Sequence, residues 1–140
     1  MDADERRWGI NSMANDSRLE LNQITEKVIG AAFEVSKVMG AGFLEKVYEN
    51  ALMHELTRRG LHACQQYAIN VYYDDIVAGE YIADIVVEDK VIVELKAVKE
   101  LDDVHMAQCM NYLHATGLHI CLLLNFGKPH VEIKRIVRDL

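Results

Sequence analysis

The sequence contains few cysteines, and none of them has a spacing typical of a bridged or metal-bound pair. The three cysteines, Cys64, Cys109 and Cys121, are odd in number and lack the CxxC pattern. A disulfide framework or a cysteine-based zinc site would need such a pattern, so neither is indicated. Scattered thiols are usual in a reducing compartment, and we therefore expect a cytoplasmic protein.

Long apolar runs and prolines are also scarce. No stretch approaches the ~18 consecutive apolar residues of a membrane-spanning helix. The charged residues 1–7 are not followed by the apolar segment of a secretory signal. The chain has a single proline and shows no internal repeat, low-complexity tract or linker. We predict a flexible N-terminal arm over the polar, aperiodic residues 1–15 and a single domain over residues 16–140.

Basic residues are outnumbered in this chain. The 15 Lys and Arg residues face 22 Asp and Glu residues, which gives a net charge of −7. Tight non-specific binding to a long duplex depends on lysines and arginines that release counterions, so this balance argues against it. Lys134, Arg135 and Arg138 form a local basic cluster, but such charges also protect an edge strand from aggregation. An acidic metal site stays compatible with the composition, because bound cations compensate its charge.

The hydrophobic periodicity predicts an α/β domain with a mixed β-sheet flanked by helices. Apolar residues at three-to-four spacing indicate helices over residues 17–39, 43–59 and 102–116. Alternating or β-branched segments indicate strands over residues 68–73, 76–87, 91–96, 120–126 and 131–137. The strand at 120–126 follows a helix, which suits a parallel crossover onto the central hairpin.

The central hairpin, residues 83–96, carries the polar side chains with the most distinctive arrangement. A three-residue turn at 88–90 places Asp84 opposite Glu94, and Glu94 shares a sheet face with Lys96. Facing carboxylates repel by roughly 0.2–1 kcal/mol, whereas a divalent cation between them produces a binding site. A lysine beside the pair can hold a water or a phosphate oxygen, as a phosphodiesterase requires. The alternative is an ordinary solvated face, which antiparallel sheets often have.

Polar residues on two of the predicted helices are further candidates. Glu45 projects onto the apolar stripe of the second helix, where a charge needs a partner or a metal. Glu55 lies on the same stripe, and a glutamate near a helix start can simply stabilise that end. On the third helix, Gln108 and Tyr112 share a face with His105 that can overlook the sheet. The alternative for Gln108 and Tyr112 is a surface or packing role.

These residues together resemble the motifs of a known superfamily. The segment Gly42-Phe-Leu-Glu-Lys-Val-Tyr48 resembles the GxxExxY signature of a small bacterial and archaeal family. Asp84, together with Glu94-Leu95-Lys96, resembles the core of the PD-(D/E)xK nuclease superfamily. The segment Gln108-Cys-Met-Asn-Tyr112 is similar to the QxxxY motif of the RecB-like exonuclease domains in that superfamily. The resemblance covers about residues 19–138. It implies a restriction-endonuclease-like mixed sheet flanked by helices.

The resemblance also implies a role for each matched position. Asp84 and Glu94 would bind Mg²⁺ or Mn²⁺, with the backbone carbonyl of Leu95 nearby. Glu45 would approach the metal directly or through water. Lys96 would orient or activate the attacking water, or stabilise charge that develops on the phosphate. The substrate-positioning residues would be Gln108, Tyr112 and Tyr48.

Two features of the chain depart from its relatives. RecB-like domains often carry a histidine in their first motif, and this chain has Glu45 there. His105, on the third predicted helix, is a candidate to replace that histidine. Some relatives bind an iron–sulfur cluster through four cysteines, and this chain, with three, is expected to bind none.

Two functional hypotheses follow. The first is a Mg²⁺- or Mn²⁺-dependent nuclease that acts on DNA rather than RNA, at ends or on single strands. The second is a catalytically silent nuclease fold that serves as a binding or assembly module, as a homodimer. The acidic net charge and the sparse basic residues favour the second, and the complete set of Asp84, Glu94 and Lys96 favours the first.

Overall fold

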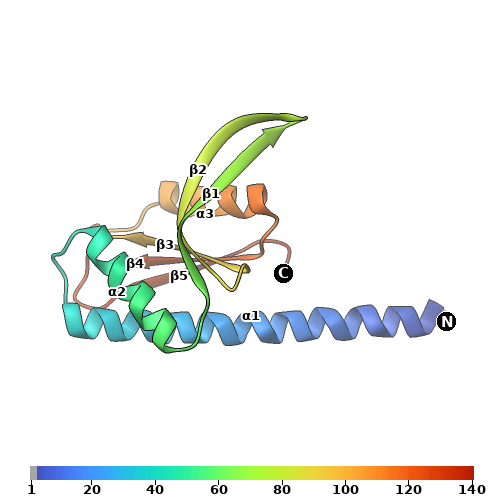
Figure 1. Ribbon diagram of the computed structural model, residues 1–140, viewed down its shortest axis with the longest axis horizontal. Helices are drawn as coiled ribbons and strands as arrows, with labels where there is room; N and C mark the ends of the chain where they lie inside the picture. Colours follow the sequence, from blue (N-terminus) through green and yellow to red (C-terminus); the bar gives the residue numbers. More distant parts are fainter. Residues whose placement is uncertain (1–2) are drawn as a thin grey trace.

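A computed structural model describes residues 3–140, with side chains described from Ser17 onward. In chain order the elements are α1 (Ala3–Met39), α2 (Glu45–Arg58), β1 (Ala63–Tyr73), β2 (Ile76–Val87), β3 (Val91–Lys96), α3 (Asp103–Thr116), β4 (Ile120–Asn125) and β5 (Glu132–Val137). The five strands form one sheet, with α1 and α2 against one face and α3 against the other (Figure 1). The predicted α/β class with a mixed, helix-flanked sheet is confirmed.

The strands lie in the order β1-β2-β3-β4-β5, and only β3 and β4 are parallel. The parallel pair confirms the predicted crossover through α3. The central hairpin has the predicted register, since Ile85 pairs with Val93 and Val87 with Val91. Its turn closes through a 3.0 Å hydrogen bond from the N–H of Lys90 to the carbonyl of Val87.

Two apolar clusters lie on opposite faces of the sheet. Val91, Val93 and Leu95 of β3 pack in the larger cluster, against α1 and α2. The alternate residues of β3 point to the other face, where Ile92 packs with α3. Glu94 and Lys96 therefore share the α3 face, as the alternation predicts. Within residues 3–140, no helix combines the length and apolar character needed to cross a bilayer.

Helix α1 begins much earlier than the sequence predicts. The apolar periodicity predicts a start at residue 17, whereas the helix begins at Ala3. Residues before Asp16 lack an apolar stripe, but no proline interrupts them, and helix formers such as Glu5 and Arg6 are frequent there. The side chains of residues 1–16 lie outside the described residues, and the flexibility of this segment stays a prediction.

Helix α2 begins at Glu45, two residues later than predicted, with Leu44 as its N-cap. Leu44 is exposed because it precedes the turns of the helix that pack on the sheet. Val38, at the end of α1, is likewise 71% exposed rather than buried as its spacing suggested. The apolar spacing therefore continues into the connection between the two helices, where the side chains are exposed and not part of the core.

Strands β1 and β2 extend past the rest of the sheet as a two-stranded β-arm, defined here as residues 67–83 (Figure 1). Strand β2 pairs with β3 only from Ile85 to Val87, so the β-arm has no third strand. A bulge separates the pairs Val71–Gly79 and Tyr72–Val77. The exposed apolar side chains of the β-arm are Tyr67, Tyr72, Tyr73, Ile76, Val77, Tyr81 and Ile82.

Helix α3 has the predicted boundaries. Asp102 caps its N-terminus by accepting the N–H of His105 at 3.1 Å, and Gly117 ends it with a left-handed φ of 75°. Tyr112 is buried, in place of the surface role that was its alternative, whereas Met110 is 39% exposed. Tyr112 lies on the same stripe as Cys109, whereas Met110 lies at the margin of that stripe.

Candidate active site

The two acidic residues of the central hairpin meet where its strands separate. Counted from the turn, the last backbone pair between β2 and β3 is Ile85–Val93. Asp84 and Glu94 are the next residue on each strand, and they are not paired through their backbones. The N–H of Asp84 donates to Glu94 Oε1 at 3.0 Å, and the N–H of Leu95 donates to Asp84 Oδ2 at 2.8 Å. Carboxylate oxygens thus replace the missing backbone carbonyls, and they fix both side chains on one side of the sheet.

Glu94 is strongly perturbed by this arrangement. Its side chain is buried, and burial together with the negative charge of Asp84 raises the pKa of Glu94 to about 9. In a buried site, ionising two carboxyl groups this close to each other has a high cost in free energy, because the two negative charges repel. A pair of this kind is typical of functional sites, because a bound cation or a shared proton relieves the repulsion.

The donor set at this pair fits a hard divalent cation. The second oxygen of each carboxylate, Asp84 Oδ1 and Glu94 Oε2, accepts no hydrogen bond from the described part of the chain. Mg²⁺ prefers oxygen ligands and is commonly held by one or two carboxylates, with water or phosphate in its other positions. The charge and the oxygen chemistry of Asp84 and Glu94 therefore match such an ion.

Glu45 does not join this pair as a third ligand. Among the side chains described, no three His, Cys, Asp or Glu residues lie close enough together to hold a metal ion. Glu45 is exposed at the first position of α2 rather than on its inner face, because the helix starts at this residue. Its projection onto the apolar stripe was misleading for that reason. An approach to the metal through water stays a prediction.

Lys96 lies at the end of β3, half-buried rather than turned into solvent. It lines a cavity of about 550 Å³ between α3 and the β-arm. Within the described residues its ammonium group has no hydrogen bond or ion pair. An amine placed beside a carboxylate pair and open to a cavity is available to a ligand.

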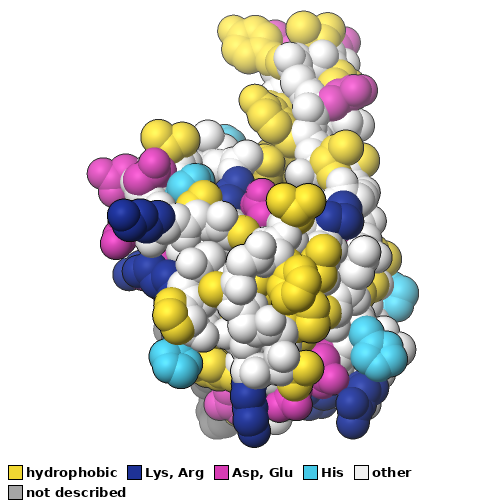
Figure 2. All heavy atoms as spheres, turned by 90° about the vertical axis from the view of Figure 1, so that its left-hand side faces the viewer, with side chains coloured by type: hydrophobic (Ala, Val, Ile, Leu, Met, Phe, Trp, Pro, Cys, Tyr) yellow, Lys and Arg dark blue, Asp and Glu magenta, His cyan; other side chains and the backbone are white. Residues whose placement is uncertain are grey.

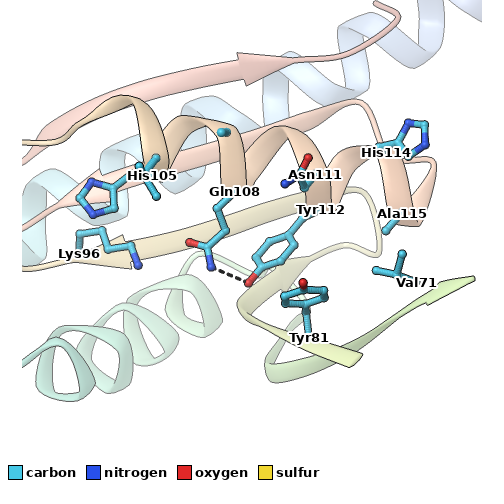
Figure 3. A pocket seen from close by; sticks show the side chains of 11 residues that line it. Val71, Tyr81, Lys96, His105, Gln108, Asn111, Tyr112, His114 and Ala115 are labelled. Atoms are coloured by element: carbon cyan, nitrogen blue, oxygen red, sulfur yellow. Dashed lines mark hydrogen bonds between the residues drawn. The ribbon is translucent and has the colours of Figure 1, made fainter. Parts of the chain in front are cut away.

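Gln108 and Tyr112 face the same cavity from α3 (Figure 3). The Gln108 amide donates to the Tyr112 hydroxyl at 3.0 Å. Burial, and then the negative charge of Glu94, raises the pKa of Tyr112 to about 12. Tyr112 therefore keeps its proton at neutral pH. Because its oxygen accepts from Gln108, its own O–H is free to donate to a ligand.

His105 also lines this cavity, near Lys96 (Figure 3). Its Nδ1 accepts the N–H of Asp102 at 3.1 Å, which completes the reciprocal cap of α3. In the neutral ring the proton then resides on Nε2. His105 thus lines the same cavity as Lys96, but its Nδ1 already accepts a backbone hydrogen bond and only Nε2 can bind a ligand.

A clamp that the sequence pattern does not predict fixes the chain at Val98, just after Lys96. Asn125, the parallel neighbour of Lys96 on β4, is completely buried. Its amide donates to the carbonyl of Val98 at 2.9 Å and accepts the N–H groups of Val98 and Gly127, each at 3.0 Å. A Cβ on Gly127 would lie 2.2 Å from the Val98 carbonyl oxygen. Asn125 is one residue beyond the apolar run, and its polarity there was the available signal.

A second missed residue is Glu49 on α2, which is only 4% exposed. Its carboxylate accepts from the amides of Gln65 and Gln66 on β1, at 2.6 and 3.0 Å, and from Lys46 at 2.8 Å. Gln66 has a φ of 54°, and like Asp84 on β2 it falls, unpaired, between the register pairs Gln65–Ile85 and Tyr67–Ala83. Glu49 therefore stabilises a strained segment beside the carboxylate pair. Its spacing of seven residues from buried Leu56 was the available sequence signal.

Tyr48, predicted to position substrate, is completely buried at the α1–α2 connection. Its hydroxyl donates to the carbonyl of Gly40 at 2.5 Å and accepts the N–H of Phe43 at 3.2 Å. Its ring stacks on Phe126 with centroids 4.7 Å apart. These contacts tie the connection to the core, so the geometry gives Tyr48 a packing role and lends no support to substrate contact.

Comparison with known structures agrees with the fold. The chain is similar to the alkaline exonuclease LHK-Exo from Laribacter hongkongensis, with a TM-score of 0.52 and 15% sequence identity. The similarity covers 67% of this chain and 56% of the exonuclease, so the chain spans little more than half the length of that protein. No sequence relative was found among curated proteins.

Comparison with protein families gives a match by sequence. Residues 22–136 match the model of the PD-(D/E)XK nuclease superfamily. The matched region runs from α1 to β5 and includes the carboxylate pair, Lys96 and the Gln108–Tyr112 pair. Because this region is most of the sequence, the chain belongs to the PD-(D/E)XK nuclease superfamily.

Proposed function

We propose that this protein is a metal-dependent nuclease that hydrolyses phosphodiester bonds in DNA, with Asp84 and Glu94 as ligands of Mg²⁺ or Mn²⁺. The observation that carries this proposal is the opposed carboxylate pair, whose Glu94 is buried with a pKa raised to about 9. A purely structural pair of acids at a strand separation would gain stability from replacement by amides. Nucleases of this superfamily generally use divalent metals, in agreement with the donor set.

The reaction adds water to phosphorus and breaks one P–O bond, which leaves a phosphate monoester and a hydroxyl group. A divalent ion at Asp84 and Glu94, with the Leu95 carbonyl nearby, would polarise the phosphate and supply positive charge against the developing negative charge. The remaining groups come from the chain itself. The ammonium group of Lys96 donates hydrogen bonds to the attacking water or to a phosphate oxygen.

Gln108 and Tyr112 position the strand in this proposal. Their hydrogen bond fixes the Tyr112 hydroxyl so that its proton points away from Gln108. A protonated phenol beside an acidic pair can donate to a phosphate oxygen without adding negative charge. The pair thus orients the phosphodiester while the cavity limits the access of bulk water.

The experiment is a cleavage assay on plasmid and on end-labelled oligonucleotides, with Mg²⁺, Mn²⁺ or EDTA. We expect cleavage that requires the divalent ion and falls by about 10²–10³-fold in Lys96→Ala. Lys99→Ala is the matched control, since Lys99 is exposed after the end of β3. Parallel RNA and DNA substrates test the choice of nucleic acid. Absence of cleavage under all metal conditions would refute the proposal.

A homodimeric assembly role is the second candidate, and the exposed side chains of the β-arm favour it. Two-stranded hairpins are marginally stable alone in water, and this one carries apolar side chains that stand out from the body (Figure 2). Light scattering at increasing concentration tests it, with a dimer as the supporting result. In that case Lys96→Ala would leave function intact. A cytoplasmic location stays a prediction from the sequence.

A further inference from the structure

We propose that Tyr81 on the β-arm is a stacking platform for one unpaired base of the substrate, so that the enzyme acts on single-stranded or frayed nucleic acid. The inference rests on the proposed nuclease function and adds a substrate class and a specificity residue to it. It follows from the position of Tyr81 on the wall of the cavity that contains Lys96.

The cavity lies between α3 and the inner face of the β-arm (Figure 3). Tyr81 and Val71 form the wall on the β-arm, and Lys96 lines the cavity from the end of β3. The ring of Tyr81 lies opposite that of Tyr112, with centroids 5.9 Å apart and planes tilted by 55°. Tyr81 thus contacts α3 at Tyr112, on the face of that helix that lines the cavity, and is not buried in the core.

Tyr81 and its partner in the β1–β2 register differ in exposure. Ile69, its partner in the β1–β2 register, is buried against α3, whereas Tyr81 is 51% exposed. A half-exposed aromatic ring on the wall of a cavity keeps part of its surface available to a ligand. Aromatic rings of this kind supply the flat surface on which nucleic-acid bases stack.

The wall opposite Tyr81 supplies polar groups. Gln108, Asn111 and His114 line the cavity from α3, and their side chains can donate or accept hydrogen bonds. An aromatic face on one side and amide or imidazole groups on the other match a nucleobase, which has a flat π-surface and polar edges.

The size of the cavity favours one nucleotide over a duplex. Its volume of about 550 Å³ falls within the range of roughly 300–1,000 Å³ that accommodates a small molecule. A duplex is far wider than one nucleotide, since its major groove alone is about 12 Å wide. Its bases are also paired and stacked on one another, so they are not available for stacking on a protein ring. An unpaired nucleotide can enter with its base against Tyr81 and its phosphate toward Lys96.

Binding of a fluorescein-labelled single-stranded dT₁₂, followed by anisotropy in EDTA, tests the inference independently of cleavage. We expect Tyr81→Ala to weaken binding by about five- to hundred-fold, the loss associated with one stacked base. Tyr81→Phe keeps the ring and should bind within about two-fold of the wild type. Tyr72→Ala is the matched control, because Tyr72 is 62% exposed on the opposite face of the same β-arm.

Each outcome decides between the two proposals. If Tyr81→Ala binds dT₁₂ as tightly as the wild type, the inference is wrong, even when the enzyme cleaves DNA. If Tyr72→Ala weakens binding as much as Tyr81→Ala, the β-arm acts as a general apolar surface and the inference is also wrong. If dT₁₂ binds through Tyr81 but no metal supports cleavage, the nuclease proposal alone fails. In the cleavage assay, Tyr81→Ala should raise KM for single strands and leave kcat nearly unchanged.

Discussion

Two hydrogen bonds cross the gap between β2 and β3 and link Asp84 to Glu94 and to its neighbour Leu95. Glu94 accepts the N–H of Asp84 at 3.0 Å, and Asp84 accepts the N–H of Leu95 at 2.8 Å. The strands thus lose their backbone pairing at the point where the two carboxylates begin. This local opening brings the acids together with Lys96, and its consequences can be measured.

The first consequence is a pH dependence of stability in the metal-free protein. Folded Glu94 keeps its proton up to about pH 9, whereas the unfolded chain releases it near pH 4.5. Between these values the folded state binds more protons, so the free energy of unfolding falls as the pH rises. Thermal unfolding in EDTA from pH 6 to pH 9 should show this decline. Glu94→Gln should flatten the decline, and an identical pH dependence in both proteins would contradict the burial of Glu94.

The second consequence concerns metal binding. A cation at the pair must displace the proton of Glu94, because carboxylate ligands bind metals in their charged form. Mn²⁺ affinity should therefore rise with pH between 6 and 9, with close to one proton released per ion. Calorimetry in buffers of different ionisation enthalpy measures that proton. Asp84→Asn should abolish binding, and affinity that is independent of pH would place the ion elsewhere.

The clamp at Asn125 yields a prediction about Lys96. In Asn125→Ala the polar groups of Val98 and Gly127 lose three hydrogen bonds in a buried site, so we expect a loss of roughly 2–5 kcal/mol in the free energy of unfolding. Because the clamp follows Lys96 directly, kcat should fall by about ten-fold or more while KM changes little. Denaturant unfolding and steady-state kinetics measure the two effects.

Asn70→Ala is the matched control for the clamp, since Asn70 is exposed on the β-arm. It should leave the free energy of unfolding within about 0.5 kcal/mol of the wild type. A loss of stability in Asn125→Ala with an unchanged kcat would show that the clamp has no influence on Lys96.

Glu45 and Glu49 provide a comparison on one helix. Glu49→Ala removes the acceptor of two glutamine amides in a buried position, and should cost about 1–3 kcal/mol in the free energy of unfolding. Glu45→Ala should be nearly neutral for stability, because Glu45 is exposed. Chemical denaturation measures both. A Mn²⁺ titration of Glu45→Ala then tests its predicted role at the metal, and a marked loss of affinity would restore that role.

Much of the site could be predicted because it depends on local rules. The register of the central hairpin follows from a three-residue turn and the alternation of side chains, which placed Asp84, Glu94 and Lys96 on one face. The helical spacing of four residues likewise placed Gln108 beside Tyr112. In both cases the partners lie on the same element or on strands joined by a short turn.

The failures came from contacts between elements and from helix ends. The inward position expected for Glu45 depended on a helix that started before it, and errors of one or two residues at helix ends are common. Asn125 and Glu49 bond to segments 27 and 16 residues away in sequence, which periodicity within one element cannot show. The β-arm resulted from early termination of the β2–β3 pairing, which the alternating pattern of β2 did not reveal.

The most direct measurement is anomalous diffraction from a crystal soaked in Mn²⁺. The account predicts a single strong peak within coordination distance of both Asp84 and Glu94, and its loss in an Asp84→Asn crystal soaked in the same way. A peak at other residues, or none near the two carboxylates at saturating Mn²⁺, would contradict it.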